Sequence, residues 1–334
     1  MASKLPPIYK DHGKTYQADT CLPLVEAVQA GQVRLEAFVH GSYPGRPLPD
    51  MVLPGLCTVG YWDAVGEQQW GLDFHRNEGI ELTFLETGNL PFTVEDQHYL
   101  LQPNDLTITR PWQPHRVGQP YIGSSRLHWV ILDLGVRRPN QDWKWPAWVV
   151  LAPEDLNELT THLRHNERPV WQGTPEIRRC FGRIGKAVEV AGDTADISRI
   201  TVYLNEILVL VLELVRQCPT KLNPSLTSTA RTVELFLADM KKNLQHEWTL
   251  KLMADSCGLG TTYFVHHCRR LTNMAPMHYL NYCRVQEAAR MLEDQPGMSV
   301  TDIAYACGFS SSQYFSTVFH RFHGCTPRDY RQRG

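Results

Sequence analysis

The C-terminal stretch DIAYACGFSSSQYFSTVFHRFHGCTPRDYR, residues 302–331, decides the fold of this part of the chain. Gly308 can take the left-handed conformation that ends one helix and reverses the chain. Phe309 then fills the turn, and Ser310 is a good N-cap for the helix that follows over residues 311–322. The spacing therefore predicts a helix-turn-helix unit.

The same pattern occurs twice, with an offset of 50 to 51 residues. The matched pairs are Leu250 and Val300, Met253 and Ile303, Ala254 and Ala304, Gly258 and Gly308, Phe264 and Phe315, Arg270 and Arg321, Pro276 and Pro327, and Tyr279 and Tyr330. In the first copy Gly260 takes the N-cap position of the second helix, over residues 261–271. Asn273 and Gly324, which tolerate positive φ, end the two second helices. We expect a continuous helix over residues 276–293 to hold the two units at a fixed separation.

Residues 302–331 resemble the signature of the AraC/XylS family of transcriptional regulators almost position for position. The first copy is looser, because Cys268 stands where the family has Phe and His267 where it has an aliphatic residue. The resemblance covers about 100 residues. It implies a sequence-specific regulator of transcription that binds double-stranded DNA, with an N-terminal domain that senses a small molecule.

Two joined recognition helices can enter adjacent major grooves about one helical turn, ~34 Å, apart. The resemblance places base reading on Thr262, Val265, His266, Gln313 and Thr317. Because Gln pairs with adenine and the methyl groups of Thr and Val pack on thymine, we expect a site that contains A and T. Other outward positions on these helices are Ser312, Ser316 and His320. Phosphate contacts are expected from Thr261, Arg269, Arg270, Ser310, Ser311 and Arg321.

Some of these residues also have a purely structural interpretation. Arg270 and Arg321 could bond the neighbouring carboxylates of Asp255 and Asp302. The histidines at 266 and 320 could be exposed polar residues without a contact to DNA.

Composition and charge describe an ordinary globular protein. Of the 334 residues, 43% are hydrophobic and 20% are charged. A chain of this length can form two or three hydrophobic cores. From residue 225 onward there are 12 Lys and Arg against 9 Asp and Glu, whereas the preceding part carries 21 against 26. Nine cysteines without a CxxC pair, together with the lack of a signal peptide or a membrane-spanning segment, predict a cytoplasmic protein with reduced thiols.

The expected fold class is α+β and multidomain. Residues 1–150 form a cupin-like β-barrel that senses an effector, because short alternating strands are separated by turn residues and resemble the N-terminal barrels of this family. Residues 151–218 form a helical dimerisation segment, 219–228 a linker, and 229–334 the all-α DNA-binding domain. Helices are expected over 153–166, 175–190 and 197–217.

The helix over residues 197–217 carries a wide apolar stripe that needs a partner surface. The stripe comprises Ile200, Leu204, Ile207, Leu208, Val211, Leu214 and Val215. It can pack on the chain's own sheet or on a second subunit. We expect it to be the contact of a homodimer, and expect activation, if it occurs, to need RNA polymerase, for which the sequence identifies no surface.

A small barrel leaves room for one small ligand. The inward candidates are His75, Glu81, Trp112 and His115, with Tyr61, Trp62 and Trp70 nearby in sequence; of these three, Trp62 is counted among the expected effector-binding residues. Indole faces together with carboxylate and imidazole acceptors suit a sugar or another polyol. The structural alternative is that these residues are ordinary core aromatics and hydrogen-bonding groups.

A metal-dependent cupin enzyme with a helical appendage is the rival function. His75, Glu81 and His115 partly match the His and Glu ligands of enzymatic cupins. However, Asp73 replaces the preceding His, and the spacing to Glu81 is one or two residues too long. No catalytic motif stands out, so the sequence predicts neither an enzyme nor a cofactor or metal.

Overall fold

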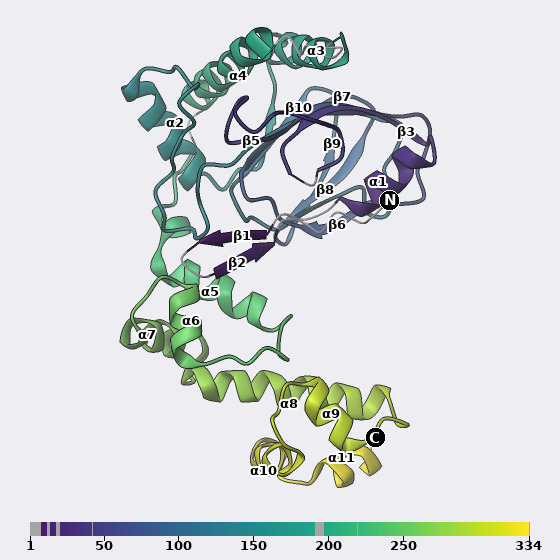
Figure 1. Cartoon of the computed structure of the whole chain (residues 1–334), viewed down its shortest axis with the longest axis vertical. Coiled ribbons are helices and arrows are strands. Elements are labelled where there is room, and N and C mark those ends of the chain that lie inside the picture. Colours follow the sequence, from purple (N-terminus) through teal and green to yellow (C-terminus); the bar gives the residue numbers. More distant parts are fainter. Residues whose placement is uncertain are drawn as a thin grey trace. The chain divides into compact units, whose positions relative to one another are not determined.

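The computed structural model describes residues 8–11, 14–17, 21–41, 43–190, 197–218 and 220–333. The chain splits into two compact units, Met1–Thr227 and Ser228–Gly334. Figure 1 shows that, among these residues, the strands all lie in the first unit and the second unit contains only helices and loops. The predicted combination of a β-rich domain with a C-terminal all-helical region is confirmed.

The first unit contains a seven-stranded sheet, a four-stranded sheet and a separate pair of strands. The seven-stranded sheet has the order β13-β10-β7-β12-β5-β3-β4 and comprises β3 (Val33–Val39), β4 (Arg46–Pro47), β5 (Leu56–Ala64), β7 (Ile80–Thr87), β10 (Asp105–Thr109), β12 (Ser125–Leu132) and β13 (Val170–Gln172). The four-stranded sheet has the order β6-β11-β8-β9 and comprises β6 (Leu72–His75), β8 (Leu90–Val94), β9 (Gln97–Leu101) and β11 (His115–Val117). The remaining elements before the helical segment are β1 (Ile8–Asp11), β2 (Lys14–Gln17) and the helix α1 (Leu22–Gln29).

The two sheets are not closed into a barrel, which corrects the expected architecture of this domain. The strand β13, which comes from the helical segment, pairs with β10 and takes the edge of the large sheet. The two sheets pack through a shared apolar cluster, in which Trp129 and Ile131 of β12 join Phe92 and Val94 of β8.

The central strand β12 is buried along nearly its whole length because its two faces serve different cores. Val130 and Leu132 belong to the cluster beneath the helices, whereas Trp129 and Ile131 face the four-stranded sheet. This alternation follows directly from the two-residue period of a strand.

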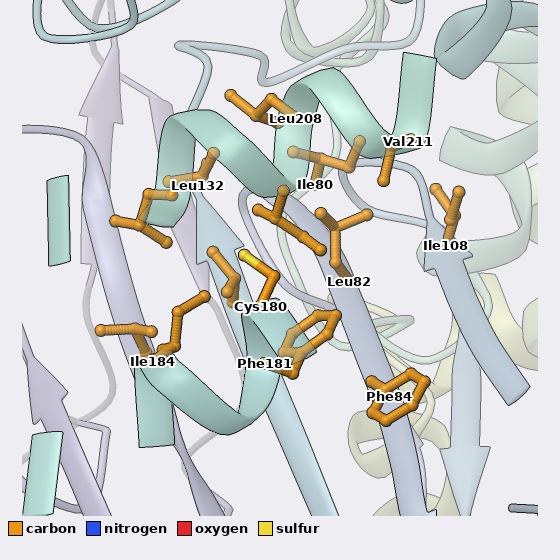
Figure 2. Close-up of a cluster of buried hydrophobic side chains, with 14 of the residues drawn as sticks. Ile80, Leu82, Phe84, Ile108, Leu132, Cys180, Phe181, Ile184, Leu208 and Val211 are labelled. Atoms are coloured by element: carbon orange, nitrogen blue, oxygen red, sulfur yellow. The ribbon is translucent and has the colours of Figure 1, made fainter. Parts of the chain in front are cut away.

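After β12 the described chain of the first unit forms the helices α2 (Pro153–His165), α3 (Pro175–Val190) and α4 (Ile197–Gln217), with β13 between α2 and α3. They match the expected ranges to within one residue. Figure 2 shows Phe181 and Ile184 of α3, together with Leu208 and Val211 of α4, against Ile80 and Leu82 of the sheet. A short 3-10 helix, η1 (Pro224–Thr227), ends this unit and packs against α2.

The apolar stripe of α4 is buried inside its own chain, so the expectation that it forms the homodimer contact is wrong. All seven stripe residues are at most 5% exposed and belong to one core cluster with the sheet and α3. Amphipathic periodicity identifies a face that needs covering but not what covers it. The large apolar side chains that α4 leaves exposed are Val202 and Val209.

The second unit is built from seven helices: α5 (Thr229–Met240), α6 (Leu250–Ser256), α7 (Thr261–Thr272), α8 (Pro276–Asp294), α9 (Val300–Ala306), α10 (Ser312–His323) and α11 (Pro327–Arg333). It has two apolar cores, one for each copy of the sequence repeat. The long helix α8 contributes Leu280 and Cys283 to the first core and Val285 and Leu292 to the second.

None of the nine cysteines forms a disulfide, and seven of them are buried whereas Cys21 and Cys218 are half-buried. Within the described residues, no helix combines the length and the apolar character that crossing a membrane requires.

The position of α4 on its own sheet gives a direct test with two adjacent residues. Leu208→Ala should lower the free energy of unfolding by about 2–5 kcal/mol, because it leaves a cavity in the core. Val209→Ala removes a side chain that is 41% exposed and should change stability by less than about 0.5 kcal/mol. Urea unfolding of the full-length variants measures both values. Equal stabilities, with loss of a dimer in the Leu208 variant, would support the original dimer assignment instead.

Candidate nucleic-acid interface and effector cavity

The two copies of the repeat form the same turn, which is closed by an equivalent backbone hydrogen bond in each. The amides of Leu259 and Phe309 donate to the carbonyls of Ala254 and Ala304, at 3.0 Å in both copies. The intervening Gly258 and Gly308 have φ of 66° and 84°, as the sequence predicted. Both alanines are fully buried where the helices of each unit cross, so each copy is a helix-turn-helix.

The helix ends agree with the predicted caps except at one position. Gly260 precedes α7, and Asn273 and Gly324 end α7 and α10 in the left-handed conformation. The cap of α10 is Ser311 rather than the expected Ser310: its hydroxyl accepts a hydrogen bond from the Tyr314 amide at 3.2 Å. Three consecutive serines are equally good caps by residue type, so the sequence did not distinguish them.

The side chains predicted to contact DNA are all accessible on α7, on α10 or in the turn before α10. Val265, Ser311, Ser312 and Ser316 are half-buried, and the exposed ones are Thr261, Thr262, His266, Arg269, Arg270, Ser310, Gln313, Thr317, His320 and Arg321. The opposite faces of the two helices hold Phe264, Cys268, Phe315, Val318 and Phe319 in the cores. Each helix therefore presents a polar face to solvent, and the packing of its apolar face in the core holds that polar face in place.

The structural alternative for Arg270 and Arg321 finds no support, because the acidic residues considered for them bond elsewhere. Asp255 forms an ion pair with Lys251 at 3.3 Å, and Asp302 accepts from the Ser299 hydroxyl at 2.6 Å. The two arginines are exposed at the C-terminal halves of the recognition helices.

Two tyrosines on the same helices were missed by the sequence reasoning. Tyr263 is 68% exposed, and Tyr314 is 49% exposed with its hydroxyl bonded to the Asn281 amide at 3.1 Å. An aromatic residue in the first turn after the N-cap, on a helix whose core positions are already filled, is the signal that could have identified them. Both can add hydroxyl contacts to a phosphate backbone.

A buried arginine joins the two helix-turn-helix units. Arg284, in the middle of α8, is 9% exposed and donates to the Leu244 carbonyl at 2.8 and 3.0 Å and to the His246 carbonyl at 3.0 Å. Leu244 belongs to the core of the first helix-turn-helix copy, and Gly308, in the turn of the second copy, lies directly against it. A Cβ at Gly308 would be 2.3 Å from the Leu244 oxygen, so only glycine permits this approach.

In the first domain, a cavity with an empty volume of about 520 Å³, part of it open to solvent, lies between the two sheets. Its walls are mainly apolar, including Leu24, Leu72, Leu127, Trp129 and Ile131. Polar atoms come from a smaller group that includes Thr58, Trp62, His75, Asn77 and Glu81. This mixture of apolar walls and a few polar groups is typical of small-molecule sites.

The cavity brings together some of the predicted effector residues but not all. His75, Glu81 and Trp62 line it, and His115, which is not among the lining residues, contacts Glu81 with its Nε2 2.8 Å from the Oε2. Trp112 is not among the lining residues; its indole donates to the Val136 carbonyl at 2.6 Å. Tyr61 points to the opposite face of β5, where its ring packs near His128.

Trp62 and Glu81 give the cavity its distinctive polar groups. The Trp62 side chain is buried, and its indole N–H finds no acceptor among the described residues. Burial raises the pKa of Glu81, but the charges and hydrogen bonds of the neighbouring His115, His75 and Asn77 together outweigh this effect and hold the pKa below its usual value. The carboxylate is therefore ionised at neutral pH.

Comparison with known proteins agrees with this geometry. A family model described as "Helix-turn-helix domain" matches residues 253–333. The chain is 36% identical over 259 residues to the HTH-type transcriptional activator RhaS of Shigella boydii serotype 18, a match that spans 77% of this chain and 87% of that protein. The RhaS of Escherichia coli (strain K12) is 35% identical over the same coverage.

Solved structures match as well. The DNA-binding domain of AdpA in complex with a target DNA is 29% identical, with a TM-score of 0.29, and the match covers 30% of this chain and 90% of that one. An apo ToxT variant from Vibrio cholerae strain SCE256 is 11% identical, with a TM-score of 0.36, over 83% of this chain and 97% of that one.

Paired helix-turn-helix units with exposed polar recognition helices define a DNA-binding regulator of transcription. The sequence match to curated transcriptional activators, which covers most of their length, identifies the family within this class. The chain belongs to the AraC/XylS family of transcriptional regulators.

The arginine contact between the units gives a stability prediction for the DNA-binding domain. Arg284→Met leaves the Leu244 and His246 carbonyls without this donor and should lower the free energy of unfolding by about 2–4 kcal/mol. Arg290→Met, on the exposed side of the same helix, should have little effect. Denaturant unfolding of the full chain, followed by the signal of the helical domain, measures the difference. Similar values for the two variants would mean that Arg284 does not join the units.

Proposed function

We propose that this regulator places α7 and α10 in successive major grooves of one duplex and that a small molecule in the cavity controls it. One observation supports the reading of DNA sequence. The accessible polar faces of α7 and α10 belong to the same compact unit, Ser228–Gly334, and the contacts of Arg284 and Gly308 hold the two helix-turn-helix copies together. The proposed base-reading residues are Thr262, Val265, His266, Gln313 and Thr317, with phosphate contacts from the flanking hydroxyls and arginines.

The cavity supports a ligand with hydroxyl groups, such as a sugar or another polyol. The apolar walls can stack on C–H groups, the Trp62 N–H can donate to a hydroxyl oxygen, and Glu81 can accept from a hydroxyl group. Such a ligand controls DNA binding only if its affinity differs between two arrangements of the protein.

We further propose that the protein acts in the cytoplasm and is not an enzyme. Nine cysteines that form no disulfide support a reducing compartment, and the curated relatives are transcriptional activators. A homodimer and a contact with RNA polymerase stay predictions. Since the stripe of α4 is buried within the chain, a dimer would have to use another surface.

Selection of bound duplexes from random DNA, using the full chain with and without a panel of sugars and polyols, tests the proposal. Enrichment of one long, asymmetric site whose yield changes with one compound is the expected result. Failure to enrich any duplex under every condition would refute DNA reading, and enrichment that no compound alters would count against the polyol.

Base reading and phosphate contact predict different effects on binding. Gln313→Ala should weaken binding to the selected site by about 1–3 kcal/mol and relax selectivity at one base pair. Arg321→Ala should weaken binding to all duplexes alike and reduce the slope of log affinity against log salt by about one. Fluorescence anisotropy with the selected and scrambled duplexes distinguishes the two. Gln295→Ala, at an exposed position after α8, is the control and should bind normally.

The indole N–H of Trp62 gives a test of the cavity. Trp62→Phe keeps an aromatic ring but removes the donor, so affinity for the active polyol should fall roughly 10-fold to 100-fold. Trp145→Phe loses an N–H that bonds to Thr160 and does not line the cavity, so it should bind the polyol normally. Calorimetric titration measures both affinities; unchanged binding in the Trp62 variant would place the ligand elsewhere.

A further inference from the structure

We propose that His75, Glu81 and His115 form a site for one divalent first-row transition-metal ion in the wall of the cavity. The ion offers its remaining coordination positions to a hydroxyl or carboxylate oxygen of the effector, and this second part rests on the proposed function. The sequence spacing argued against such a site. The structure differs because the three residues come from strands of both sheets rather than from one local motif.

The three side chains converge on one point. One potential ligand atom from each residue lies within 4.8 Å of the other two. His75 and His115 are cross-strand partners in β6 and β11, and their ring centroids are 4.2 Å apart. The Glu81 Oε2 and the His115 Nε2 are 2.8 Å apart, a hydrogen-bond distance, whereas adjacent ligands with metal bonds of about 2.1 Å are roughly 3.0 to 3.4 Å apart. The two groups therefore have to separate by only a few tenths of an ångström to admit an ion.

Each histidine is oriented by a second hydrogen bond of the same kind. The Nδ1 of His75 lies 2.8 Å from the Asp73 carbonyl, and the Nδ1 of His115 lies 3.0 Å from the Gln113 carbonyl. Because a carbonyl oxygen can only accept, both Nδ1 atoms carry the proton, so in the neutral rings Nε2 holds the lone pair that can bind a metal ion. Metal-binding histidines are usually held by this arrangement.

The carboxylate of Glu81 is oriented as well. The Asn77 amide donates to its Oε2 at 2.8 Å, and the Thr109 hydroxyl donates to the same oxygen at 3.4 Å. The side chain is 12% exposed, so a compact cation is a better partner for it than bulk water. Two histidines and one carboxylate, each supported by a hydrogen bond to a neighbouring group, match the set that binds a metal and leaves positions open.

A second His–Glu pair in the same domain shows what a purely structural arrangement looks like. The His128 Nε2 lies 2.7 Å from the Glu86 Oε2, but Arg126 and Arg178 also approach this carboxylate, at 3.9 and 3.7 Å. Guanidinium groups therefore already supply positive charge at Glu86. This pair is a matched control, because it offers the same two ligand types without a third.

The alternative for the proposed site is a simple ion pair, in which a proton on the His115 Nε2 bonds to Glu81. The two arrangements use the same nitrogen and exclude each other. A metal ion requires His75 as well, whereas the ion pair does not.

The test uses untagged full-length protein that has been dialysed against a chelator and then titrated with Co²⁺. We expect one equivalent of Co²⁺ per chain, seen as visible absorption bands, and competition by Zn²⁺. His75→Gln and Glu81→Gln should weaken binding by more than about 100-fold, and His128→Gln should leave it unchanged. His75 is only half-buried, so its variant is the one least at risk of unfolding, and circular dichroism confirms that each variant is folded.

The experiments test the metal site and the proposed DNA-binding function independently. No Co²⁺ bands in the folded parent protein, or equal binding by all three variants, overturns the metal site. Duplex selection on the same preparations reports DNA binding independently, so a failure there leaves the metal result intact. Polyol affinity that is the same with and without Zn²⁺ overturns the role of the ion in effector binding alone.

Discussion

The DNA-binding domain depends on one contact, the Arg284 guanidinium held by the carbonyls of Leu244 and His246. A helix such as α8 fixes the distance between the two recognition helices but leaves their relative rotation sensitive to small bends. The loop before α6 lies against the turn of the second unit, with Gly308 allowing backbone contact, and this removes that freedom. The grooves of one duplex follow a fixed helical path. A protein that inserts two recognition helices into them therefore needs a fixed distance and a fixed rotation between these helices.

The first domain divides its large sheet between two tasks. One face is covered by α3 and α4 and forms an extended apolar core, in which Phe84 stacks on Phe181 with ring centroids 5.2 Å apart. The other face meets the smaller sheet incompletely and leaves the cavity with its few polar groups. Stability and ligand recognition are therefore separated by the thickness of one sheet, so side chains on the cavity face can vary without disturbing the core under the helices.

The sequence predicted what depends on local chemistry and missed what depends on distant partners. Glycine and asparagine at the helix ends, the repeated turns and the three helices of the first domain followed from residue type and periodicity. The partner of the α4 stripe did not, because periodicity identifies a face and not its cover. Arg284 was missed since a charged residue among apolar neighbours gives no sign of the carbonyls that receive it. The convergence of His75, Glu81 and His115 depends on pairing between strands far apart in the sequence, and Trp112 turned towards Val136 for the same kind of reason.

The edge strand β13 connects the strand that carries part of the cavity wall to the helix α3. Its three residues pair with Asp105, Leu106 and Thr107 of β10, and the same strand β10 carries Thr109, which bonds to Glu81 at the cavity. Two residues after β13 the chain reaches Thr174, which precedes α3. A continuous backbone path therefore joins Thr109 at the cavity to the first turn of α3, through the pairing of β10 with β13 and the two residues that follow β13.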